Sequence, residues 1–139
     1  MGFLITSISG FLALFLILFT LVLPYVLRWQ MRRGDVWTAA WQRMKLHYWI
    51  GYAVLILTIL HMYVSMGAGL AHRTSTLGLD LATLGLLLIL IQVALGISLR
   101  SANATGRLRL RRMHFVIMAG IVMIVLVHLA LNSVLIQVI

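Results

Sequence analysis

Four long runs of apolar residues divide the chain, and shorter polar segments separate them. The runs cover residues 3–27, about 46–66, about 81–99 and about 113–139. A helix needs about 20 apolar residues to cross the hydrocarbon core of a bilayer, so each run is long enough to span it. In lipid the backbone must satisfy its hydrogen bonds internally. The pattern therefore predicts four transmembrane helices joined by connectors of about 18, 14 and 13 residues.

The composition favours a membrane protein over a water-soluble one. The chain has 139 residues, of which 63% are hydrophobic and 9% charged. Soluble domains carry roughly 25% charged residues. The length allows one domain, over residues 1–139, and the connectors leave no room for a soluble unit. We therefore expect an all-α integral membrane four-helix bundle.

The positive charges predict the orientation of the bundle. Ten of the eleven cations fall in the first and third predicted connectors: Arg28, Arg32, Arg33, Arg43, Lys45, Arg100, Arg107, Arg109, Arg111 and Arg112. The positive-inside rule assigns these connectors to the cytoplasm and both termini to the other side of a bacterial or archaeal plasma membrane. The net charge of +9 is then explained by topology and by attraction to lipid headgroups, and a nucleic-acid partner is not expected.

Four of the five histidines form a regular pattern. His47 and His61 are 14 residues apart in the second apolar run, and His114 and His128 are 14 apart in the fourth. Fourteen residues make nearly four helical turns, so each pair shares a helix face and spans about 21 Å. The second and fourth helices run in the same direction. His47 should therefore face His114, and His61 should face His128, at two depths.

Facing imidazoles can hold a flat cofactor between two helices. Haem iron accepts histidine from both sides, and helix bundles build such sites from facing helices. The pattern predicts two stacked b haems between the second and fourth helices, with His47, His61, His114 and His128 as iron ligands. Zinc, which takes three or four ligands, fits two histidines less well. A purely structural role, with hydrogen bonds across helices, is the alternative.

Other residues near these histidines are weaker candidates. Gly51 and Gly120 could leave room for haem, although helix packing explains each glycine equally well. Arg43 and Arg112 could pair with haem propionates, although headgroup anchoring explains any single arginine better. Asn132 shares a face with His128, where it could bond a haem edge or the backbone. His72, in the second connector, is explained as a loop residue or as a propionate or quinone-site partner.

The two histidine pairs at 14-residue spacing, on the second and fourth of four helices, resemble the di-haem b-type cytochromes. The order is similar to the haem-bearing half of bc-complex cytochrome b and to the core of ferric-reductase-like cytochromes b. The resemblance covers nearly the whole chain in helix order, and it implies that the four histidines are haem ligands. Neither a quinol-site motif of the bc type nor a flavin or nucleotide domain accompanies it.

The resemblance implies transmembrane electron transfer through two haems. We expect the chain to be the membrane subunit of a larger oxidoreductase or respiratory complex rather than an enzyme alone. Its partners would be other subunits, a quinone or quinol in the bilayer, and a periplasmic redox protein. Two alternatives stay open. One is a stand-alone oxidoreductase acting on quinol, superoxide or ferric chelates, and the other is a chlorophyll-binding membrane protein.

Overall fold

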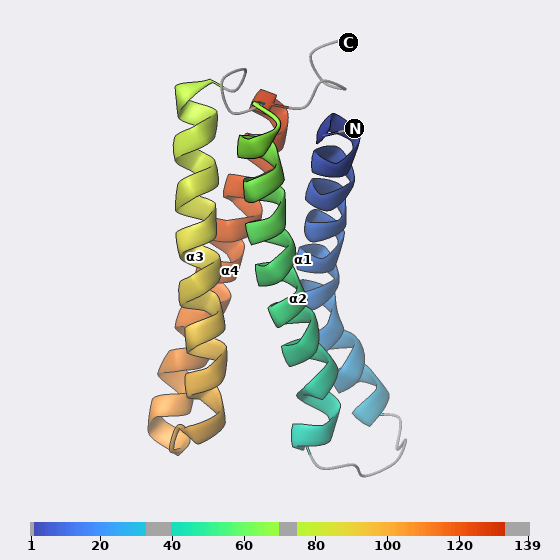
Figure 1. Cartoon of the computed structure of the whole chain (residues 1–139). Helices are drawn as coiled ribbons and strands as arrows, with labels where there is room; N and C mark the ends of the chain where they lie inside the picture. Colours follow the sequence, from blue (N-terminus) through green and yellow to red (C-terminus); the bar gives the residue numbers. More distant parts are fainter. Residues whose placement is uncertain (1, 33–39, 70–74, 133–139) are drawn as a thin grey trace.

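A computed structural model of the chain is all-helical, as the apolar pattern predicts (Figure 1). The structure describes residues 2–32, 40–69 and 75–132. These residues form four helices: α1 (Gly2–Arg32), α2 (Ala40–Gly67), α3 (Thr76–Ser101) and α4 (Ala104–Asn132). The helices alternate in direction, so α2 and α4 run parallel to each other (Figure 1).

The helices pack as two hairpins that form a four-helix bundle. Contacts are most extensive within the α1–α2 and α3–α4 hairpins, and fewer contacts join α2 to α3 and α1 to α4. This places α2 and α4 on one diagonal of the bundle. Residues on the inner faces of α2 and α4 therefore meet across the interior.

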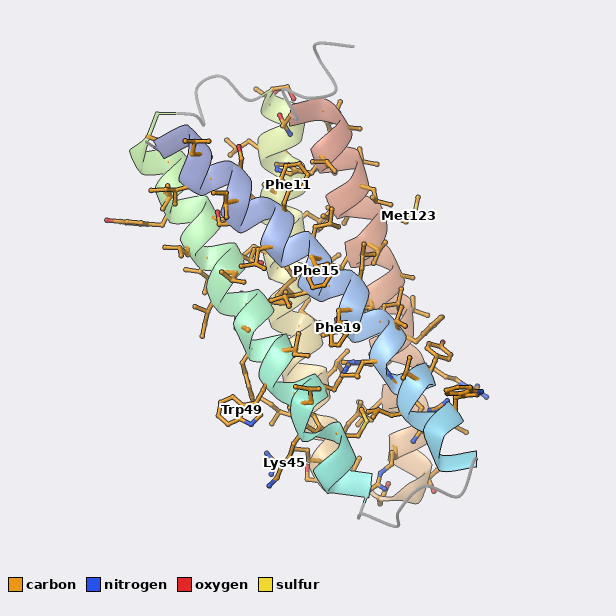
Figure 2. All side chains as sticks on the ribbon, turned by 90° about the vertical axis from the view of Figure 1, so that its right-hand side faces the viewer. Phe11, Phe15, Phe19, Lys45, Trp49 and Met123 are labelled. Atoms are coloured by element: carbon orange, nitrogen blue, oxygen red, sulfur yellow. The ribbon has the colours of Figure 1, made fainter. Side chains whose placement is uncertain are left out.

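All four helices are long and apolar enough to cross a membrane: Leu4–Trp29, Met44–Gly67, Thr76–Ser101 and Thr105–Asn132 are the candidate spans. The outward surface is apolar, as a lipid-facing surface should be. Phe11, Phe15 and Phe19 form a row along α1 and are each at least 40% exposed, and Met123 projects outward from α4 (Figure 2). The chain is an integral membrane protein whose helices contact the bilayer.

The predicted start of the fourth helix at residue 113 is wrong. The helix begins at Ala104, and only two residues separate it from α3. Asn103 caps it, because its Oδ1 accepts a hydrogen bond of 2.8 Å from the Gly106 backbone N–H. The arginine-rich segment after this cap continues the helix because arginine and leucine are good helix formers. Hydropathy marks the lipid-embedded part of a helix and misses such polar extensions.

The cations consequently lie mainly on helix ends and not in connectors, contrary to the prediction. Among the residues described they lie at the last turns of α1 and α3 and in the first turns of α2 and α4. These ends meet at one end of the bundle, which we call the basic end (Figure 1). Arg33, in the first connector, and His72 and Arg73, in the second, lie outside the described residues.

One apolar layer fills the middle of the bundle. Ile17, Val54, Ile89 and Ile121 are each at most 5% exposed and pack together, with one residue from each helix. Val54 lies seven residues from both His47 and His61, and Ile121 lies seven from both His114 and His128. The central layer therefore separates the bundle interior into two compartments, each with two histidines.

Candidate functional site

The structure brings together the histidines of α2 and α4 in the two pairs that the spacing predicts. The ring centroids of His47 and His114 are 6.2 Å apart, with their planes tilted by 60°. His61 and His128 are close enough to interact electrostatically. All four side chains are partly buried. We call His47 and His114 the basic-end pair, and His61 and His128 the opposite-end pair.

His61 is held by the backbone of α1. Its Nδ1 lies 2.9 Å from the Thr6 carbonyl oxygen and 3.3 Å from Ser9 Oγ, which itself donates to the same carbonyl. A carbonyl only accepts hydrogen bonds, so Nδ1 must carry the hydrogen. The neutral ring then keeps a lone pair on Nε2, which is the form that binds a metal ion.

His128 is held in the same way by the backbone of α3. Its Nδ1 lies 3.0 Å from the Gly78 carbonyl oxygen. Asn132 lies beside the ring, with Nδ2 at 3.2 Å from Nδ1, and donates instead to the His128 carbonyl at 2.9 Å. Since the Gly78 carbonyl requires a donor, Nδ1 carries the hydrogen and Nε2 again keeps its lone pair. Asn132 therefore contacts the histidine and its backbone.

The basic-end pair also lies beside backbone carbonyls. The Thr20 carbonyl is next to His47, and the Gln92 carbonyl is next to His114. The Nδ1 atoms of both rings are buried, and their geometry falls short of a full hydrogen bond. Pro24 lies inside α1, four residues after Thr20. Because proline has no N–H, it leaves the Thr20 carbonyl without its intrahelical donor and available to His47.

The four carbonyls repeat the interval of the histidines. Thr6 and Thr20 are 14 residues apart on α1, and Gly78 and Gln92 are 14 apart on α3. In each hairpin the first helix thus supplies two carbonyls and the second supplies two histidines. Sequence reasoning missed these residues because a carbonyl is present at every position. The threonines at the histidine interval and Pro24 were the available signals.

Glycines also shape the two compartments. A Cβ on Gly10 would lie 2.9 Å from His61 Cε1, so this glycine allows α1 to approach the ring. A Cβ on Gly96 would lie 3.8 Å from His114 Cε1. By contrast, a Cβ on Gly51 or Gly120, the two glycines singled out from the sequence, would meet no atom within 4 Å. Gly51 and Gly120 therefore border open space and do not support a close helix contact.

The two candidate arginines, Arg43 and Arg112, lie toward the starts of α2 and α4 at the basic end, and their pairing with haem propionates stays a prediction. Arg112 is exposed at the basic end. Arg43 lies in the first turns of α2, and its side chain is outside the described part of the structure. Tyr48 is an aromatic neighbour of His47, with ring centroids 6.1 Å apart in an edge-on arrangement.

The basic-end pair has a ring separation that fits a metal ion held between two imidazoles. Two metal–nitrogen bonds of about 2 Å each, together with the ring radii, separate such imidazole centroids by about 6 Å. The basic-end pair has this separation. Among the described residues no group of three or more His, Cys, Asp or Glu gathers, so each compartment offers two ligands. This set suits haem, whose four remaining iron ligands belong to the porphyrin.

Comparison of the chain with protein-family models, with curated proteins and with solved structures finds no match.

Proposed function

We propose that the chain is a di-haem b-type membrane cytochrome that transfers electrons across the bilayer. The observation that carries this proposal is the pairing of four histidines across the bundle, one pair on each side of the central layer. Ionisable residues inside a membrane are functional candidates by default. A role in helix packing alone would not require two pairs with the same interval.

The chain's own residues would hold the cofactors in defined positions. The basic-end pair would ligate one haem and the opposite-end pair the other. The carbonyls of Thr6 and Gly78 fix the protonation and orientation of His61 and His128, which makes these rings better ligands. A Cβ at Gly51 or Gly120 would meet no atom within 4 Å, which supports room for a porphyrin beside these positions. When bound, each haem supplies an iron that accepts and releases one electron.

The spacing of the two pairs suits electron transfer across a membrane. Fourteen residues of helix separate them by about 21 Å, which is most of the hydrocarbon core of about 30 Å. The chain would exchange electrons with a quinone in the bilayer and with other subunits of a membrane redox complex.

Under the positive-inside rule the basic end faces the cytoplasm. A reporter fused after Ile139 should then be active only if it works outside the cytoplasm, and cytoplasmic activity would reverse the orientation.

The test is the haem content and absorption spectrum of the purified full chain. A pyridine haemochrome assay should give about two b haems per chain, with sharp α and Soret bands on reduction. His47→Ala should remove one of the two haems. His72→Ala, which changes the fifth histidine, is the matched control and should keep both.

Two outcomes would reject the proposal. Strong far-red absorption would indicate chlorophyll, and a haem content of zero in preparations from haem-replete cells would exclude a cytochrome. A third measurement distinguishes a subunit that only transfers electrons from an enzyme that acts alone. Proteoliposomes of the chain alone should carry electrons from an external reductant to an enclosed acceptor without turning over quinol, superoxide or ferric chelates.

A further inference from the structure

A groove opens on the surface between α2 and α3 at the basic end. It has a volume of about 240 Å³, and its lining consists of Lys45, Tyr48, Trp49, Tyr52 and Arg100. The groove lies where α2 and α3, which make fewer contacts than the two hairpins, separate toward the basic end (Figure 1). None of the four paired histidines lines it.

The lining of the groove changes from charged to aromatic along α2. Lys45, Tyr48, Trp49 and Tyr52 follow one helix face, and Tyr52 lies about 10 Å deeper along the helix than Lys45. Lys45 and Trp49 project from α2 on the same side (Figure 2). Arg100 reaches the groove from α3, with its guanidinium carbon 6.0 Å from the centre of the Tyr48 ring. Two cations therefore lie at the level where tryptophan and tyrosine meet the membrane interface.

We propose that this groove binds the phosphate headgroup of an anionic phospholipid. Lys45 and Arg100 provide the positive charge, and arginine binds phosphate oxygens with two parallel N–H donors. Trp49, which is 71% exposed, and Tyr52 provide the surface along which the glycerol and upper acyl chains lie. Basic pockets between transmembrane helices on the cytoplasmic side are suited to anionic lipid headgroups. This inference does not depend on haem.

The experiment measures the preference of the full chain in nanodiscs for spin-labelled phosphatidylglycerol over spin-labelled phosphatidylcholine. A cation near an anionic surface strengthens binding about fivefold. Lys45→Gln combined with Arg100→Gln should therefore reduce the preference at least about fivefold. The control is Arg109→Gln combined with Arg111→Gln, which removes the same charge from exposed positions on α4 and should change the preference less than about twofold.

Two further comparisons separate loss of binding from misfolding and the lipid from other ligands. Lys45→Arg combined with Arg100→Lys keeps both charges and should retain the preference. If the glutamine variant loses the preference while its helix content is unchanged, the loss is due to charge and not to misfolding. Free inorganic phosphate should not displace the labelled lipid. Equal losses in the groove and control variants, or displacement by inorganic phosphate, would overturn the proposal. Because Tyr48 connects the groove to His47, displacement by a short-chain benzoquinone would assign the groove to quinone and also overturn it.

Discussion

Single backbone groups determine the chemical state of the histidines. The carbonyls of Thr6 and Gly78 require a donor, so His61 and His128 carry hydrogen on Nδ1 and keep a lone pair on Nε2. His61 depends on close approach of α1, which Gly10 permits. A small residue on one helix thus controls a polar side chain on the next.

Gly10→Ala should disturb His61 selectively. The added methyl group would lie 2.9 Å from His61 Cε1, so the ring must move away from the Thr6 carbonyl. Losing this hydrogen bond should lower the free energy of unfolding by about 1 kcal/mol, and haem should be lost from the opposite-end pair. Denaturant titration in mixed micelles and the reduced spectrum measure the two effects. Gly67→Ala, where a Cβ meets nothing within 4 Å, is the control, and an equal effect there would mean that the contact between Gly10 and His61 is not the cause.

Pro24→Ala should act on the basic-end pair alone. Alanine restores the intrahelical donor to the Thr20 carbonyl, which then interacts less with His47. A histidine with a weaker Nδ1 partner is a less basic ligand and stabilises oxidised iron less. The midpoint potential of the basic-end haem should therefore rise by on the order of 20–40 mV, while the other stays constant. Redox titration measures both, and a change in the opposite-end haem alone would refute this role.

The packing of the four helices holds the two histidine pairs at a fixed separation. The central layer holds one apolar residue from each helix and keeps α2 and α4 at a distance that suits paired imidazoles. In lipid, helices associate through close packing because the surrounding acyl chains are equally apolar. Packing at this layer should therefore contribute more to stability than the larger apolar outer surface.

Ile121→Ala should destabilise the bundle much more than Ile56→Ala. Ile121 is 1% exposed in the central layer, so its truncation leaves a cavity that should cost about 2 kcal/mol. Ile56 is 65% exposed toward lipid, and the same change there should cost less than about 0.5 kcal/mol. Unfolding in mixed micelles compares the two variants. Equal losses would mean that the central layer is not the core of the bundle.

For the bundle as a whole, hydropathy and periodicity predicted different features. The apolar runs identified the four helices, and the 14-residue interval identified which histidines meet. Hydropathy misplaced the start of α4, because residues 104–112 are helical without being apolar. The partner carbonyls were missed because a carbonyl is present at every position, and only Thr6 and Thr20 at the histidine interval and Pro24 gave an indirect signal. Arg112 is exposed at the basic end, and its pairing with a haem propionate stays a prediction.

Four single variants compared side by side show whether the four histidines form two independent haem sites. His47→Ala and His114→Ala should remove the same component from the reduced-minus-oxidised spectrum, and His61→Ala and His128→Ala should remove the other. Each variant should retain about one haem per chain. If His47→Ala and His128→Ala removed the same component, or if any of the four variants kept both haems, the histidines would not form these two sites.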